Sequence, residues 1–88
     1  MSVDSSLSPS LATRIPVLSA REVEVLLAWF AFDSKEEAAA SLYISQTTVN
    51  THVTRIRAKY ALVGRSARTK SQLLARAIQD GYTSLDDW

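Results

Sequence analysis

Residues 44–60, ISQTTVNTHVTRIRAKY, carry their apolar side chains at helical spacing. Val49, Val53, Ile56 and Tyr60 follow one another at intervals of four, three and four residues, which places them on one face of an α-helix. Many of the other residues are threonines and further β-branched types, which are mediocre helix formers, and all the charges are basic. The exposed residues of this helix are therefore not those that would make it most stable, which indicates that they serve another role.

Capping signals mark the starts of four helices. Three of them combine a hydroxyl residue with Glu or Gln three residues later, as in the capping box: Ser19–Glu22, Ser34–Glu37 and Thr69–Gln72. Ser45 can cap a fourth helix with its hydroxyl alone, and Gly81 suits the C′ position after the last one. The sequence predicts helices over residues 20–32, 35–42, 46–60 and 70–80. No segment alternates with period two, so we expect an all-α, four-helix fold without a sheet.

The middle of the chain has the organisation of a helix-turn-helix. A short second helix is followed by the tight turn YIS, with Ile44 directed inward, and then by the longer helix 46–60. Residues 1–16 are rich in Ser with two prolines and indicate a flexible linker or tail. We expect the domain to span residues 17–82, with a C-terminal tail over 83–88.

The charges are distributed unevenly, although the net charge is only +1. Residues 45–79 contain seven Lys and Arg residues and no acid, whereas residues 1–44 contain three bases and six acids. Such asymmetry favours a polyanionic partner over a merely solvated basic face. The chain has no cysteine, no secretory signal and no apolar run long enough to cross a membrane, so we expect a cytoplasmic protein without membrane contact.

The exposed face of helix 46–60 has the properties of a DNA reader. Opposite the apolar seam lie short side chains: Thr47, Thr51, Thr54 and Ala58. Short side chains let a helix sit deep in the major groove, where Asn50 could pair with adenine through two hydrogen bonds. Arg55 and Lys59 are placed to meet phosphates, with Arg57 a weaker candidate. The alternative for each threonine is an ordinary surface residue.

Catalysis and metal binding have little support in the sequence. His52 is the only histidine, and its helix carries no cysteine or carboxylate that could complete a metal site or a catalytic pair. We expect no catalytic residue, no metal and no cofactor, and we place His52 as a partly buried helix residue near the phosphate backbone.

Three segments, LSAREVEVLL, SKEEAAASLYIS and TTVNTHVTRIRAKY, resemble the LuxR/NarL-type (GerE-like) helix-turn-helix domain over residues 18 to about 81. The resemblance implies a four-helix DNA-binding domain of a transcription regulator whose third helix enters the major groove. It implies base contacts from Asn50, Thr51 and Thr54. It also implies phosphate contacts from five residues: Ser45, Thr47, Thr48, Arg55 and Lys59. The fourth helix often mediates dimerisation in this family, which implies a homodimer through helix 70–80.

The chain departs from the family pattern at several positions. Asn50 stands where the family frequently has Lys, Phe32 stands where a glycine usually ends the first helix, and the loop ALVGRSAR is about three residues longer than usual. A second apolar stripe on helix 20–32, formed by Val23, Leu27 and Phe30, is also unexpected. Either the loop or a tail folds over this stripe, or it docks an upstream receiver domain or a second protomer.

The sequence therefore predicts sequence-specific binding of double-stranded DNA by a transcriptional regulator, as the output domain of a two-component response regulator. Met1 followed by a linker-like stretch favours a fragment whose regulatory part precedes it. Two alternatives remain: a promoter-binding domain like region four of a sigma factor, and a helical protein-interaction module with an acidic partner.

Overall fold

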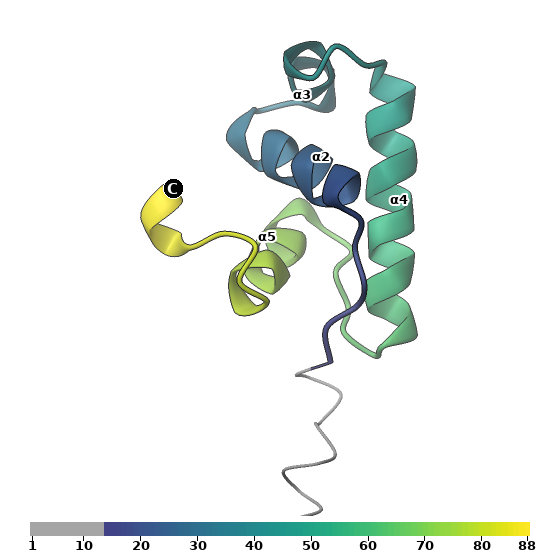
Figure 1. Ribbon diagram of the computed structural model, residues 1–88, viewed down its shortest axis with the longest axis vertical. Coiled ribbons are helices and arrows are strands. Elements are labelled where there is room, and N and C mark those ends of the chain that lie inside the picture. The colour runs from purple at the N-terminus through teal and green to yellow at the C-terminus, as the bar shows by residue number, and fades with distance from the viewer. Residues whose placement is uncertain (1–13) are drawn as a thin grey trace, which may run out of the picture.

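The computed structural model describes residues 14–88, which fold into four α-helices and one short 3₁₀ helix (Figure 1). The elements are α2 (Ala20–Ala31), α3 (Lys35–Ser41), α4 (Gln46–Leu62), α5 (Lys70–Gln79) and η2 (Leu85–Asp87). No strand occurs in this part of the chain, so the predicted all-α fold is confirmed. Each predicted helix is present, with its ends moved by at most two residues.

The predicted capping residues begin the helices. Ser19 and Thr69 form complete capping boxes with Glu22 and Gln72, and Ser45 caps α4 through its hydroxyl. The box predicted at Ser34 is only half formed. The Ser34 hydroxyl accepts a hydrogen bond from the Glu37 backbone N–H. The Glu37 carboxylate in turn accepts from the Ser34 hydroxyl, and not from the Ser34 backbone N–H as a complete box requires.

Three helices end in the same left-handed turn. In each, the N–H of the C″ residue donates to the carbonyl oxygen five residues earlier, and the N–H of the C′ residue donates to the carbonyl oxygen three residues earlier. Gly81 occupies the C′ position after α5 with φ +82°, as predicted. Gly64 does the same after α4, and this turn lets α4 run two residues beyond its predicted end. After α3 the C′ residue is Tyr43, with φ +57°. By contrast, α2 ends at Phe32 in an extended conformation, so no glycine is needed there.

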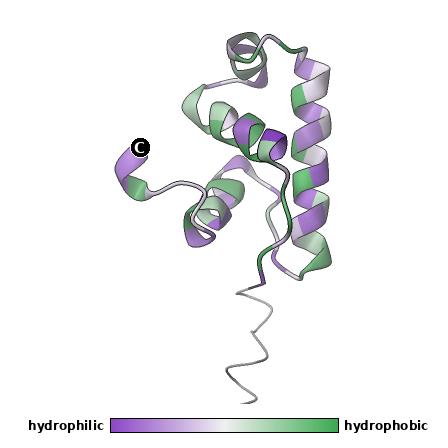
Figure 2. Cartoon of the chain, in the orientation of Figure 1, coloured by the Kyte–Doolittle hydropathy of each residue, from purple (hydrophilic) through white to green (hydrophobic). Residues whose placement is uncertain are grey.

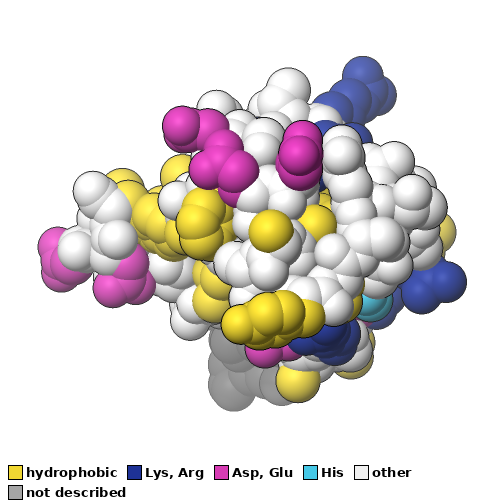
Figure 3. All heavy atoms as spheres, turned by 90° about the horizontal axis from the view of Figure 1, so that it is seen from above, with side chains coloured by type: hydrophobic (Ala, Val, Ile, Leu, Met, Phe, Trp, Pro, Cys, Tyr) yellow, Lys and Arg dark blue, Asp and Glu magenta, His cyan; other side chains and the backbone are white. Residues whose placement is uncertain are grey.

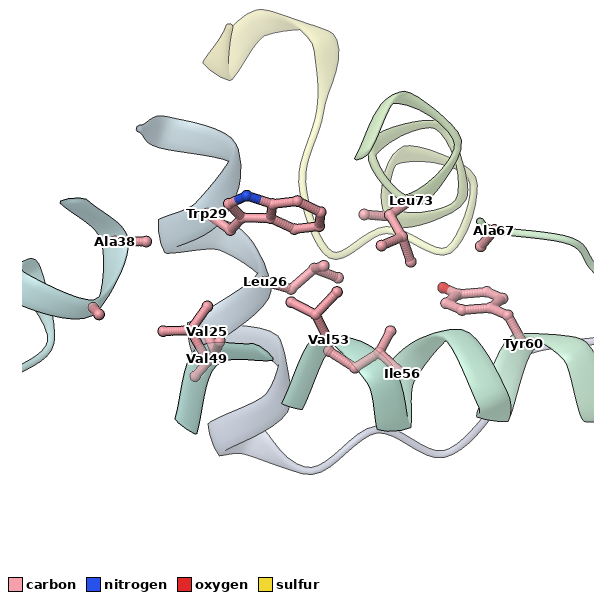
Figure 4. Packing of buried hydrophobic residues seen from close by; sticks show 12 residues of the cluster. Val25, Leu26, Trp29, Ala38, Val49, Val53, Ile56, Tyr60, Ala67 and Leu73 are labelled. Carbon is pink, nitrogen blue, oxygen red and sulfur yellow. The ribbon is translucent and has the colours of Figure 1, made fainter. Parts of the chain in front are cut away.

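The core lies where α2 and α5 pack against one side of α4 (Figure 4). The four seam residues predicted for α4 are fully buried: Val49, Val53, Ile56 and Tyr60. They meet Val25, Leu26 and Trp29 of α2, and Leu73 packs on them from α5 (Figure 4). Ala38 and Ala39 are buried on α3, where small side chains allow a close approach. In Figure 2, α4 is mostly hydrophilic (purple and pale), and its hydrophobic residues (green) appear as separate bands along the helix.

The unexpected second stripe on α2 is partly covered from the C-terminus. Val23, Leu27 and Phe30 are each half-buried. The Phe30 ring packs against the core and meets the Trp88 ring edge to face, with 6.2 Å between centroids. Residues 83–88, expected to be a tail, thus turn through η2 (yellow in Figure 1), and Trp88 contacts α2 through Phe30. Docking of a partner on the remainder of this stripe stays a prediction.

The segment before α2 runs along the domain. Pro16 is buried, and its carbonyl oxygen lies 3.5 Å from the Tyr82 hydroxyl. Residues 14–16 therefore contact the domain, whereas the sequence indicates a flexible tail over 1–16; residues 1–13 of that segment lie outside the described part. No helix within residues 14–88 is long and apolar enough to span a membrane.

Candidate nucleic-acid interface

The side of α4 opposite its buried seam is open to solvent. Thr47, Asn50, Thr51, Thr54 and Arg55 are all exposed, as the helical spacing predicted. Thr48 and His52 are half-buried at one edge of this surface. We call the exposed side of α4 from Thr47 to Ala58 the outer face. No acidic residue occurs within it.

The hydroxyl groups of the outer face differ in what they can still bind. The Thr51 hydroxyl donates to the Thr47 carbonyl oxygen at 3.0 Å, so its proton is used within the helix and its oxygen can still accept a hydrogen bond. The Ser45 and Thr48 hydroxyls bond each other at 2.9 Å. Thr54 and Arg55 make no side-chain hydrogen bond to any residue between 14 and 88. These last two are therefore free to bind an external group without breaking an internal contact.

The N-terminus of α4 differs from those of the two preceding helices. Acidic residues occupy the first turn of α2 (Glu22) and of α3 (Glu36 and Glu37), where they offset the positive end of the helix dipole. The first turn of α4 contains no acid. The N-terminal N–H groups of α4 and its dipole thus favour an external anion such as a DNA phosphate.

One edge of the outer face faces the start of α2. An open groove there is lined by Ser19, Glu22, His52, Arg55, Ala58 and Lys59. Lys59 lies across it: its ammonium donates to the buried Glu22 carboxylate at 2.6 Å and to the Val17 carbonyl oxygen at 3.0 Å. Burial opposes the ionisation of Glu22, but the hydrogen bonds from Lys59 and from the Ser19 backbone lower its pKa below the ordinary value of 4.5. Lys59 therefore has a structural partner that the sequence did not reveal.

The other edge carries a cluster of cations, of which the sequence singled out only Arg57. Three basic groups from three helices lie over the Trp29 ring: Lys35 Nζ at 5.3 Å, Lys70 Nζ at 5.4 Å and the Arg57 guanidinium carbon at 5.8 Å from its centroid. Such contacts between cations and an aromatic face are attractive. We call these residues the Trp29 cation cluster. Lys35 stands among the acids of the N-terminal half, so only the folded chain shows that it belongs here.

Another base, Arg65, is withdrawn from the surface. Its guanidinium is 1% exposed and pairs with the buried Asp80 carboxylate at 2.8 and 3.0 Å. The Tyr60 hydroxyl donates to the same carboxylate at 2.6 Å, and Arg65 also donates to the Arg14 carbonyl oxygen. Burial, together with the hydrogen bond to Asp80, raises the pKa of Tyr60. This network joins the ends of α4 and α5, so Arg65 holds the fold rather than an anion.

His52 is half-buried, as expected, and its Nδ1 atom has no hydrogen-bond partner in the described chain. Residues 14–88 contain no group of three or more His, Cys, Asp or Glu side chains that could hold a metal ion. In Figure 3 the surface beside this histidine (cyan) is largely white and dark blue, while most acidic side chains lie on the other side of the view.

Comparison with models of protein families shows to which family this domain belongs. The family described as bacterial regulatory proteins, luxR family (GerE), matches residues 16–69. The chain belongs to this family. The match covers α2, α3 and α4 and ends just before α5. A search of curated proteins and a search of solved structures found no match.

Membership confirms the resemblance seen in the sequence. Domains of the luxR family are DNA-binding regulators of transcription rather than enzymes, and the helix pair α3–α4 is the helix-turn-helix of this one. The outer face is therefore the candidate surface for DNA. Which of its residues contact bases and which contact phosphates stays a prediction.

Proposed function

We propose that this luxR-family domain binds double-stranded DNA sequence-specifically, with α4 in the major groove. The observation that carries the proposal is the outer face itself: it is exposed, free of acid, built from short polar side chains and flanked by cations on both edges. We assign base contacts to Asn50, Thr51 and Thr54, because amide, hydroxyl and methyl groups match the major-groove edges of bases.

Phosphate contacts belong to the margins of the same surface. Ser45, Thr47 and Thr48 stand at the N-terminus of α4, where the helix dipole adds to their hydrogen bonds. Arg55 is free on one edge, and Arg57 and Lys70 of the Trp29 cation cluster flank the other. Lys59 is the weakest member of the set, because a phosphate must compete with Glu22 for its ammonium.

We further propose that the domain is the output part of a response regulator, controlled by an upstream receiver domain, and that it dimerises on DNA through α5. Ser71, Ala75 and Gln79 are exposed on α5 and leave its outer face open to a second copy. DNA binding of this kind would place the protein in the cytoplasm.

Titration of the chain with duplex DNA at two salt concentrations tests the proposal. Binding to phosphates releases counterions, so log K should fall with log salt by a slope of about 0.9 per phosphate neutralised. A duplex enriched from a random pool should bind more tightly than a scrambled duplex of the same composition. Binding that ignores salt, or equal affinity for both duplexes, would contradict the proposal and favour a protein partner or non-specific binding. Enrichment only in the presence of RNA polymerase would favour the sigma-factor alternative.

The symmetry of the enriched sequence tests the dimer. Two half-sites about one helical turn apart would support dimerisation, and a single half-site bound by one chain would contradict it.

A further inference from the structure

Lys35 and Asn50 meet across the helix-turn-helix. Lys35 is the first residue of α3 and Asn50 lies on the outer face of α4, yet the Lys35 ammonium donates to the Asn50 Oδ1 atom at 2.6 Å. It is the one side-chain hydrogen bond between α3 and α4 in the described chain. Neither residue is buried, so the pair is not required to satisfy a group in the core.

The Lys35 ammonium is held in place rather than freely mobile. It lies 5.3 Å from the centroid of the Trp29 ring, and Trp29 itself is 6% exposed and packed in the core. The core thus fixes the ring, the ring attracts the ammonium, and the ammonium orients the amide of Asn50. A side chain on the outer face is thereby positioned by a residue of the neighbouring helix.

This contact settles which way the amide points. An ammonium group can only donate hydrogen bonds, so the oxygen of Asn50 must face Lys35 and the Nδ2 group must point away. An unconstrained asparagine reads adenine by accepting from N6 and donating to N7. The Asn50 oxygen already accepts from a cation, and the positive charge beside it disfavours a second N–H donor such as adenine N6. The amide therefore offers the DNA a donor, and the remaining N–H groups of Lys35 add further donors. Guanine presents two acceptors, N7 and O6, on its major-groove edge.

We propose that Lys35 and Asn50 act as one donor unit that selects guanine at a single position of the DNA site. The inference rests on the proposed function and refines it: Asn50 contacts the base, and Lys35 is the residue that sets its specificity. The bidentate adenine contact suggested by the sequence alone is replaced by an acceptor-reading contact.

Selection of duplexes from a random pool by the full chain tests the inference, with Lys35→Met as the decisive variant. Methionine keeps the unbranched apolar stem over Trp29 and removes the ammonium. Lys70→Met is the matched control, since Lys70 lies at 5.4 Å from the same ring without touching Asn50. We expect the wild-type motif to contain a guanine, preferred over adenine roughly 5- to 150-fold, that changes to adenine in Lys35→Met. Lys70→Met should bind all duplexes more weakly and keep the wild-type motif.

A second variant makes the result independent of how well Lys35→Met folds. Asn50→Ala, at an exposed position, should lose the guanine preference, and adding Lys35→Met to it should change that position no further, because the two residues act as a unit. Additive effects of the two substitutions would overturn the inference.

The outcomes separate the two proposals. A wild-type chain that enriches no sequence overturns the proposed function, and this inference with it. A wild-type motif that Lys35→Met leaves unchanged, or that already has adenine at the position lost in Asn50→Ala, overturns the inference alone.

Discussion

The two halves of α4 place their polar side chains in opposite surroundings. In the N-terminal half, Thr47, Asn50, Thr51 and Thr54 face solvent, and within residues 14–88 only Asn50 makes a side-chain hydrogen bond to another helix. In the C-terminal half, Lys59 bonds the buried Glu22 and Tyr60 bonds the buried Asp80. The N-terminal half, which we call the reading half, is left free to bind. The C-terminal half, which we call the anchoring half, is tied into the domain.

The difference shows that basic charge in a sequence is not the same as basic charge available to a ligand. Residues 45–79 contain seven bases and no acid, which indicated a polyanionic partner. In the folded chain Arg65 is neutralised by Asp80 and Lys59 by Glu22, and both acids come from outside that segment. The charge presented to DNA is therefore smaller and lies mainly on Arg55 and the Trp29 cation cluster.

The largest effect should come from the anchoring half. Asp80→Asn leaves the buried Arg65 guanidinium without its counter-charge, so we expect the free energy of unfolding to fall by about 3–5 kcal/mol. Denaturant unfolding followed by circular dichroism measures this, with the exposed Asp86→Asn as the control. A loss below about 1 kcal/mol would show that the network is not what joins α4 to α5.

In the reading half the effect should appear in binding instead. Thr54→Ala should lower affinity for the selected duplex by about 1–3 kcal/mol while changing affinity for random duplex little. Stability should stay the same or rise slightly, because alanine is the better helix former and Thr54 makes no internal hydrogen bond in the described chain. Fluorescence anisotropy on both duplexes measures the two affinities, with Ser66→Ala, at an exposed position between α4 and α5, as the control. Equal losses on both duplexes would remove Thr54 from the base-reading set.

Lys59 lies in the anchoring half, although the sequence predicts that it contacts a phosphate, and Lys59→Met separates these two roles. We expect unfolding to become easier by about 1–2 kcal/mol, since a buried carboxylate loses its main donor, and DNA affinity to change less than stability. The pH dependence of stability gives a second, independent test of the ion pair between Lys59 and Glu22. The lowered pKa of Glu22 stabilises the wild-type fold above about pH 4.5, and this contribution is lost as the pH falls through the folded-state value.

The variant should lose most of that acid sensitivity, because burial without Lys59 favours the protonated carboxyl. Thermal unfolding of wild type and Lys59→Met between pH 3 and pH 7 measures it, with Lys70→Met as the control. If stability is unchanged and affinity for every duplex falls alike, Lys59 is a phosphate contact after all.

The smallest effect concerns the turn that leads into the reading half. Tyr43 is 96% exposed and has φ +57°, a conformation that costs a residue with a Cβ atom about 1–2 kcal/mol. Tyr43→Gly should raise the free energy of unfolding by about 0.5–1 kcal/mol, since glycine's extra freedom in the unfolded chain offsets part of the gain. A simultaneous loss of DNA affinity would show that the strained tyrosine is kept for binding. Destabilisation would instead reveal a contact that the Tyr43 ring makes in the fold.

Local signals predicted the helices well because each signal acts within one turn of chain. The hydroxyls of Ser19, Ser45 and Thr69 and the glycine at position 81 satisfy or close helix ends without help from distant residues. The apolar seam of α4 followed from its spacing for the same reason. Phe32 and Tyr43 give no such signal. The chain leaves α2 at Phe32 in an extended conformation, and Tyr43 adopts the left-handed conformation after α3 that glycine usually takes.

The sequence by itself determined the fold class, the family, the buried seam of α4 and the short polar character of its outer face. Periodicity, capping and a contiguous motif are properties of neighbouring residues. Only the tertiary structure decided which cations are free. Lys59 meets Glu22 across 37 positions, Arg65 meets Asp80 across 15, and Lys35 reaches Asn50 across 15. Ion pairs and hydrogen bonds depend on distances of a few ångströms in space, and these are set by how α2, α3 and α5 pack around α4.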